Sequence, residues 1–225
     1  MSKTLKELRD RLTRLTDNEN SSFISEEEYN DYLNDSLADL REFVITQAPE
    51  LFIDPDAYSF STVADQAVYT LADNHYQVYA VDLVDGNSTY NIERQTFRAR
   101  NKWQNVYVSQ SITSAPYFRF HTPTNDKLQF TPAPSGVYTI NVWYIPSYTI
   151  LTSDTDRTPN QLEDNWLNCA VYDAAIKCKI KSEEPVAEFI RMREDIRGAI
   201  QNTFLERLTN STHYATDVYR GFSNG

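Results

Sequence analysis

Several residue types that build chemical sites are scarce in this sequence. It contains 5 glycines and 3 histidines among 225 residues, which is few glycines for a phosphate-binding loop. None of the motifs GxGxxG, GxxxxGK[ST] or GxSxG occurs. His75, His121 and His213 lie in different segments without a histidine or cysteine at ligand spacing, whereas zinc needs three or four convergent ligands. We therefore expect a protein that is not an enzyme, with no catalytic residues, no cofactor and no metal site.

Long apolar runs and a pair of cysteines able to form a disulfide are also missing. No run of about 18 apolar residues occurs, so we expect no membrane-spanning segment. The charged N-terminus lacks the apolar core of a signal peptide. Cys169 and Cys178 fall in one expected helix, about 13 Å apart along its axis. This separation is too long for a disulfide, and it indicates assembly in a reducing cytoplasm.

Acidic residues dominate the charge of the chain. There are 32 acidic and 21 basic residues, which give a net charge of −11. Such a surface repels polyphosphate and disfavours tight nucleic-acid binding driven by counterion release. An acidic wall past which DNA slides without adhering is compatible with this charge, and solubility alone explains it equally well.

The N-terminal fifth of the chain has helical periodicity. An amphipathic helix is expected over residues 3–16, because leucines recur there at spacings of three and four. Ser25 and Glu28 have the spacing of a capping box, which predicts a second helix ending near Gln47. Ile24 and Tyr29 flank this cap at the positions of a hydrophobic staple.

Helical periodicity returns in the C-terminal third. The stretch that begins with Asn160 predicts a third helix, with Asn160 and Glu163 as a capping pair. Asp173 falls on the otherwise apolar side of this helix. Pro185 suits the first turn of a fourth helix, which is expected to end near Leu208.

Residues 58–148 have the composition of a β-sheet domain. Tyr, Phe, Val, Ile and Thr dominate this region between turn signals, which predicts five or six antiparallel strands in a sandwich or rolled sheet. The segment TPTND is expected to be the turn of a hairpin. One segment could be either a short helix or a loop, and its basic cluster is expected to be a solvated or partner-facing surface: Arg94, Arg98, Arg100 and Lys102.

The order of these segments predicts an α+β fold. Four helices form a bundle, and the antiparallel β-sandwich or rolled sheet is an insertion between helices 2 and 3. An extended C-terminal tail follows the last helix. The expected boundaries are 1–50 and 151–208 for the two halves of the bundle, 51–150 for the β insertion and 209–225 for the tail.

Several segments, in this order, resemble the head-to-tail adaptor (connector) proteins of tailed bacteriophages. They are LKELRDRLTRLTD, SSFISEEEYNDYLNDSLADL, FSTVADQAVYTL, KLQFTPAPSGVYTINVWYIP and LTSDTD. The resemblance covers about residues 3–208. Ala72 stands where the family has a proline after its Tyr-x-Leu strand.

The resemblance implies a structural virion protein at the head-tail neck. Such adaptors form a ring, commonly of twelve copies, below the portal protein. The ring extends the channel through which genomic DNA passes without specific binding, and it offers a docking face to tail, nozzle or tube proteins. No membrane is involved, and the host cytoplasm is the expected place of assembly.

The C-terminal segment is the expected portal-binding site. Adaptor C-termini reach the portal, and aromatic residues in a segment without a core position are costly to leave in water. An arginine near them could pair with a carboxylate or stack on a ring. The expected portal-binding residues are Tyr214, Tyr219, Arg220 and Phe222.

One alternative is a receptor- or glycan-binding virion module that uses the tyrosine-rich sheet as a platform. It requires aromatic side chains exposed together on one face. A hydrolase would need a polar cluster that the sequence does not display.

Overall fold

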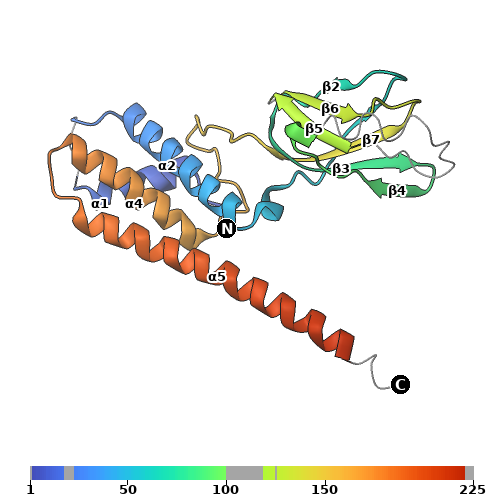
Figure 1. Cartoon of the computed structure of the whole chain (residues 1–225). Coiled ribbons are helices and arrows are strands. Elements are labelled where there is room, and N and C mark those ends of the chain that lie inside the picture. The colour runs from blue at the N-terminus through green and yellow to red at the C-terminus, as the bar shows by residue number, and fades with distance from the viewer. Residues whose placement is uncertain (1, 18–22, 100–118, 125, 221–225) are drawn as a thin grey trace. The chain divides into compact units, whose positions relative to one another are not determined.

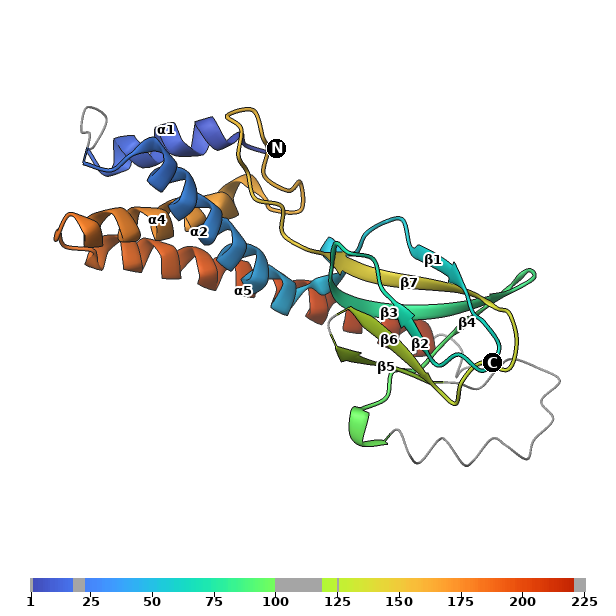
Figure 2. The same cartoon turned by 90° about the horizontal axis from the view of Figure 1, so that it is seen from above.

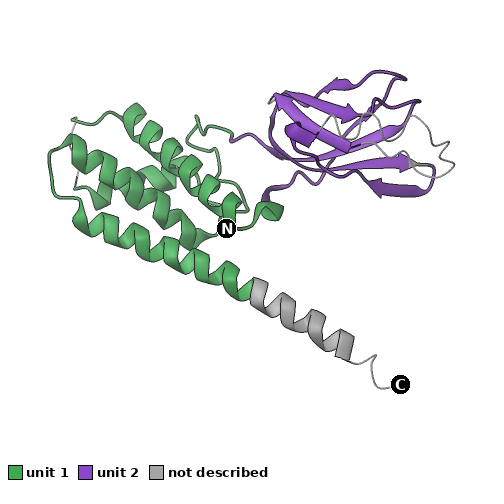
Figure 3. Ribbon diagram, viewed as in Figure 1, with its two compact units in different colours: residues 1–51, 149–225 green, residues 52–148 purple. Residues whose placement is uncertain are grey.

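The computed structural model describes residues 2–17, 23–99, 119–124 and 126–220, without the side chains of Asp85 and of residues 208–220. The chain forms two compact units, which Figure 3 shows in different colours. Residues 1–51 and 149–225 make a helical unit, and residues 52–148 make a β unit. Four helices and two antiparallel sheets are therefore present in the described part, in agreement with the predicted mixture of helices and an inserted β domain.

The first two helices begin at capping boxes. Helix α1 spans Leu5–Leu15, and helix α2 spans Glu26–Gln47. The Ser25 side chain accepts a hydrogen bond from the Glu28 N–H, and the Glu28 carboxylate accepts one from the Ser25 N–H. This confirms the predicted cap and the predicted end of α2. Ile24 and Tyr29, the expected staple residues, are both buried.

Helix α4 is the central element of the helical unit. It spans Asp164–Lys181 and contacts α1, α2 and the following helix α5, Ala187–Arg220 (Figures 1 and 2). Apolar side chains of all four helices are buried, and burial of this kind is the main stabilising term. The fully buried members include Leu5, Leu12, Leu33, Leu37, Val44, Ala174, Cys178 and Ile200.

Three predictions about the C-terminal helices are wrong. Glu163 is the N-cap of α4 but makes no side-chain capping bond, so Asn160 and Glu163 do not form a capping pair. Pro185 precedes the first residue of α5 by two positions. The segment from Thr209 is not an extended tail, because α5 continues to Arg220. No glycine or proline interrupts residues 199–220, so nothing in the backbone requires the helix to stop at Leu208.

The β unit contains two antiparallel sheets. The short 3-10 helix η1, Pro49–Phe52, leads from α2 into the β unit. The first sheet has the order β1-β7-β3-β4, and the second has the order β2-β6-β5. The strands are β1 Tyr58–Ser61, β2 Val68–Thr70, β3 His75–Asp85, β4 Ser88–Asn91, β5 Arg119–Thr124, β6 Lys127–Thr131 and β7 Thr139–Pro146.

One apolar core is shared by both sheets. Leu83 on β3 and Ile140 on β7 contribute to it from the first sheet, and Phe120 on β5 and Phe130 on β6 contribute from the second. The predicted antiparallel sandwich is thereby confirmed, with seven strands in the described part where five or six were expected. Strands β5 and β6 form the predicted hairpin.

Side chains of α1 and α2 hold the segment that returns from the β unit. The Asn34 amide donates to the Leu151 carbonyl oxygen at 2.9 Å and accepts from the Leu151 N–H at 2.8 Å. Arg9, on α1, donates to the Asp154 carboxylate at 2.7 Å and to Asn30 on α2 at 3.0 Å. The return segment is thus bonded to both N-terminal helices before α4 begins.

A truncation of Leu37 tests this packing. Leu37 lies on α2 with 0% of its surface exposed, so Leu37→Ala leaves a cavity. We expect the helical unit to lose about 3 kcal/mol of unfolding free energy, measured by urea unfolding with circular dichroism. The control is Ile180→Ala, which removes a side chain 61% exposed on α4 and should change stability by about 0.5 kcal/mol or less. Equal effects of the two changes would contradict the packing of α2 against α4.

Candidate interaction surfaces

The expected portal-binding residues fall at the C-terminal end of α5. Tyr214, Tyr219 and Arg220 belong to the helix, and their side chains lie outside the described part. Phe222 lies outside the described residues altogether. Their role as a binding site therefore stays a prediction. The structure adds that the backbone of this segment is helical through Arg220.

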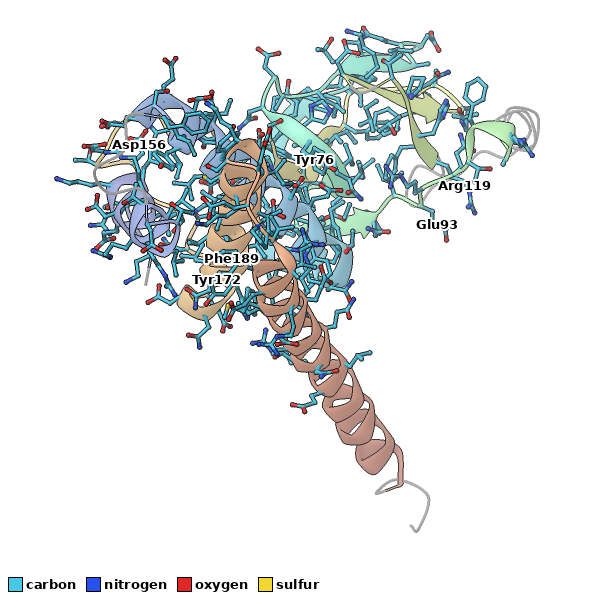
Figure 4. The ribbon with its side chains drawn as sticks, turned by 90° about the vertical axis from the view of Figure 1, so that its left-hand side faces the viewer. Tyr76, Glu93, Arg119, Asp156, Tyr172 and Phe189 are labelled. Carbon is cyan, nitrogen blue, oxygen red and sulfur yellow. The ribbon has the colours of Figure 1, made fainter. Side chains whose placement is uncertain are left out.

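Ring contacts between α4 and α5 hold the described part of α5 in place. The ring centroids of Tyr172 and Phe189 lie 6.3 Å apart (Figure 4), and those of Trp166 and Phe204 lie 5.5 Å apart. Pairs at these distances add to the burial of their apolar surface.

An ion pair extends this contact towards the C-terminal end of α5. The Arg207 guanidinium lies 3.5 Å from the carboxylate of Glu163, which occupies the N-cap position of α4. Among the residues with described side chains, α5 therefore packs on α4 from Phe189 to Arg207. Residues 208–220 continue the same helix from this anchored part.

Asp173 on α4 binds residues of both neighbouring helices. Its carboxylate accepts hydrogen bonds from Arg193 on α5 at 2.6 Å and from Ser36 on α2 at 2.9 Å. Lys177 lies 3.6 Å away on the same helix. Burial by itself would raise the pKa of Asp173, but the bonds from Arg193 and Ser36 and the charge of Lys177 outweigh it, and this pKa lies below its usual value.

Helix α2 carries a row of carboxylates on its exposed surface. Residues four apart are neighbours on a helix surface. Four exposed acidic residues have this spacing, and we call them the acidic ridge: Glu27, Asp31, Asp35 and Asp39.

The acidic ridge is only partly neutralised within the chain. Lys177 lies 3.7 Å from Asp35, whereas Glu27, Asp31 and Asp39 form no ion pair with any residue that the structure describes. Like charges four residues apart each destabilise a helix by about 0.2–0.5 kcal/mol. The ridge therefore lowers the stability of α2 slightly and concentrates negative charge on its exposed surface.

The β unit carries a positively charged surface beside the edge strand β5. Arg94, Phe97 and Arg98 are all exposed, and we call them the basic–aromatic patch. Phe97 is 55% exposed, and the centroids of the Phe97 and His121 rings lie 5.6 Å apart in an edge-to-face arrangement. The Arg94 guanidinium lies 5.8 Å from the centre of the Phe120 ring, within cation–π range.

Backbone bonds to β5 hold the segment that carries this patch. The Gln95 N–H donates to the Phe120 carbonyl oxygen at 2.8 Å, and the Phe120 N–H donates to the Glu93 carbonyl oxygen at 3.1 Å. The short 3-10 helix η2, Phe97–Ala99, follows directly. Glu93 also forms an ion pair with Arg119 at the start of β5, and Figure 4 shows the two side chains together.

The predicted basic cluster is thus only partly described. Arg94 and Arg98 lie in this patch, whereas Arg100 and Lys102 lie outside the described residues. Sequence reasoning missed Phe97 as part of the surface, although its place between two arginines was a visible signal. It also missed the Glu93–Arg119 pair, because the two residues are far apart in the chain.

The residues with metal-binding or nucleophilic side chains are spread over the molecule. His75 bonds the Ala72 carbonyl oxygen through Nδ1 at 2.6 Å, and His121 is buried in the β unit. No group of three His, Cys, Asp or Glu residues suited to a metal ion exists among the described residues. Cys169 and Cys178 are free thiols, as their helical spacing predicted, and both are buried.

None of the described helices has the length and apolar character needed to cross a lipid bilayer.

The family of the chain is established by comparison with known proteins. The family model of the SU10 adaptor protein matches residues 3–217, nearly the whole chain. The chain belongs to this family of bacteriophage adaptors, which are structural proteins and not enzymes, and the resemblance seen in its sequence is confirmed. No curated protein matches the chain.

Replacing Asp173 tests its bonds to α2 and α5. Asp173→Asn removes the charge of the more buried of the two carboxylates that pair with Arg193, the other being Glu194, and this arginine side chain is 23% exposed. We expect a loss of about 2 kcal/mol, below the range for a fully buried pair because of that exposure. Urea unfolding measures the loss, and Asp39→Asn on the exposed surface of α2 is the control.

The pH dependence gives a second measure of the same bonds. The native pKa of Asp173 is lowered, so its ionised form contributes stability above about pH 4, and this contribution is lost as the pH falls through the native pKa. Wild type and Asp39→Asn should therefore lose more stability than Asp173→Asn on acidification. Parallel curves for all three proteins would contradict the account.

The two thiols should be unreactive in the native protein. Burial raises the pKa of the Cys169 thiol, and it raises the pKa of Cys178 to about 12. A thiol reagent attacks the thiolate, so at about pH 8 we expect no modification until the protein is unfolded in denaturant, where both thiols react. Their contribution to stability is complete below about pH 8.5 and lost as the pH rises towards the native pKa. Native reaction at the rate of a free thiol would refute this.

Proposed function

We propose that this chain is a head-to-tail adaptor that docks as a ring on the portal of a bacteriophage. The ring extends the DNA channel and provides the face to which tail, nozzle or tube proteins attach. The observation that carries the proposal is the family match over residues 3–217. This match favours the adaptor over a receptor- or glycan-binding module, for which the tyrosine-rich sheet is the only support.

Two separate units suit a ring subunit. A closed ring needs two different surfaces on every copy, because each copy contacts its neighbours head to tail. In our proposal the four helices form a bundle in the ring wall, twelve copies close the ring, and the β unit meets tail components. The division at residues 51/52 and 148/149 supports this, since it leaves each unit with a core of its own.

The charge of the helical unit suits a channel for DNA. This unit holds 24 acidic and 15 basic residues, and the β unit holds 8 and 6. Excess negative charge repels phosphate groups, so DNA passes such a wall without adhering. In this proposal, genomic DNA therefore passes through the channel without binding specifically to its wall.

The C-terminal part of α5 is the proposed portal-binding segment. A helix without tertiary packing is marginally stable in water, and the described packing of α5 on α4 reaches Arg207. Contact with the portal would supply packing to the turns that follow. Aromatic residues are good anchors for such a contact, and the proposed anchors are Tyr214, Tyr219, Arg220 and Phe222.

The neck of the virion is the location that the family implies. We propose that assembly takes place in the host cytoplasm, where both buried thiols stay reduced.

A truncation ending at Leu208 tests the portal-binding segment. The described contacts of α5 lie at or before Arg207, so the truncated chain should melt at the temperature of the full chain. It should fail to co-sediment with purified portal rings, because it lacks all four proposed anchors. A full-length Tyr214→Phe variant, which keeps the aromatic ring, should bind as wild type does. A truncated chain that binds the portal normally would refute the assignment.

A further inference from the structure

We propose that the basic–aromatic patch of one copy docks on the acidic ridge of the next copy. Arg94, Phe97 and Arg98 would thereby contact α2 of a neighbouring subunit. This inference rests on the proposed ring, because it assigns one of the contacts that close it. The argument uses the build of the patch, the charges of the ridge and the nature of a head-to-tail contact.

The patch is built to present its side chains outward. Its segment is bonded on both sides of Arg94 to the edge strand β5, because the Glu93 carbonyl oxygen accepts from the Phe120 N–H and the Gln95 N–H donates to the Phe120 carbonyl oxygen. Phe97 leaves 55% of its surface exposed, although it touches the His121 ring. An exposed aromatic ring between two exposed arginines has the composition found at the centre of protein interfaces.

The ridge offers the opposite charge in a regular row. Its four carboxylates follow one another at about 6 Å along α2, the rise of four helical residues. Among the residues with described side chains, Asp35 is the one ridge member that forms an ion pair, with the Lys177 ammonium at 3.7 Å. Across the described ranges, Glu27, Asp31 and Asp39 lack ion pairs, and so do Arg94 and Arg98. Both surfaces therefore hold charge that a neighbouring copy could neutralise.

Another copy suits the patch better than nucleic acid does. Glu93 adjoins Arg94 and keeps 65% of its side chain exposed, even though it pairs with Arg119. Tight binding of a polyphosphate needs many cations, and the chain as a whole carries a net charge of −11. Two arginines match the few carboxylates of the ridge that lack ion pairs within the described ranges.

The pairing also joins two different surfaces, as a closed ring requires. The patch and the ridge are different surfaces on different units of one chain. When each copy gives its patch to one neighbour and its ridge to the other, the contact is head to tail and can close into a ring. Charged contacts of this kind fix register and reject wrong partners more than they add affinity.

Charge reversal on the full-length chain tests the contact. Arg94→Glu with Arg98→Glu reverses the patch, and Asp31→Lys with Asp39→Lys reverses the ridge. All four side chains are exposed, and melting curves show whether each variant folds. Lys127→Glu and Glu188→Lys are the matched controls, being single charge reversals outside both surfaces. Assembly on purified portal rings is scored by electron microscopy and sedimentation at several salt concentrations.

We expect each reversal to reduce ring assembly, and we expect only a contact between opposite charges to restore it. Each reversed variant alone should assemble at least about tenfold less well, because like charges then face each other. A mixture of the two variants should recover rings in which the variants alternate, because a reversed patch then meets a reversed ridge and a native patch meets a native ridge. One chain carrying both reversals should also recover complete rings. High salt should weaken wild-type assembly, and the controls should behave as wild type.

Three outcomes would overturn the inference. If both reversed variants form rings as wild type does, the contact lies elsewhere while the ring itself stands. If the chain with both reversals recovers its own thermal stability but no rings, the two surfaces pair within one chain. If only binding of labelled duplex DNA falls when the patch is reversed, the patch contacts nucleic acid. Failure of wild type to assemble on the portal would instead contradict the proposed function.

Discussion

The orientation of α4 between its two neighbours α2 and α5 depends on a single buried carboxylate. Asp173 is the one residue of α4 that is bonded by side chain to both α2 and α5, through Ser36 and Arg193, among the bonds the structure describes. Apolar packing is non-directional, so leucine and alanine surfaces alone allow α4 to rotate or slide. The two short bonds fix its rotation relative to both neighbours. Every surface on these helices, from the acidic ridge to the start of the C-terminal segment, is therefore presented in one arrangement.

Because the β unit is inserted between α2 and α4, bonds that hold these two helices together are needed. About a hundred residues separate α2 from α4 in the chain, and the entropy of closing so long a loop opposes their contact. The Asn34 amide offsets part of this cost by bonding the Leu151 backbone as a neighbouring strand would. Asp156 then holds the return segment in a turn, because its carboxylate accepts the N–H groups of Thr152 and Ser153 at 2.8 Å. These backbone bonds lower the pKa of Asp156.

Local signals predicted much of this fold. The capping box at Ser25 works through residues three apart, so the sequence alone locates the start of α2. Strands β1, β2 and β4 have four residues or fewer, which is too short for alternation to reveal, and this explains the low strand count. The end of α5 was misjudged because the last residues show no helical period of apolar side chains, whereas residues 199–220 contain no glycine or proline that would break the helix.

The interaction surfaces were harder to predict because they are built from distant residues. Asp173 was placed correctly on the buried side of its helix, but its partner Ser36 precedes it by 137 positions, and no local pattern connects them. The basic cluster could be recognised from the composition of its segment. The backbone bonds that hold this segment to β5 could not, because the edge of a strand exists only in the folded sheet. The portal-binding residues were inferred from aromatic content and family resemblance, and their function is a proposal.

The most direct test of the account is electron cryomicroscopy of the purified portal with this chain bound. The account predicts a closed ring of the chain coaxial with the portal, an open central channel, and density from the C-terminal end of α5 against the portal. A portal that stays bare, or isolated copies bound on its outside without a ring, would contradict the claim that this chain is the adaptor between head and tail.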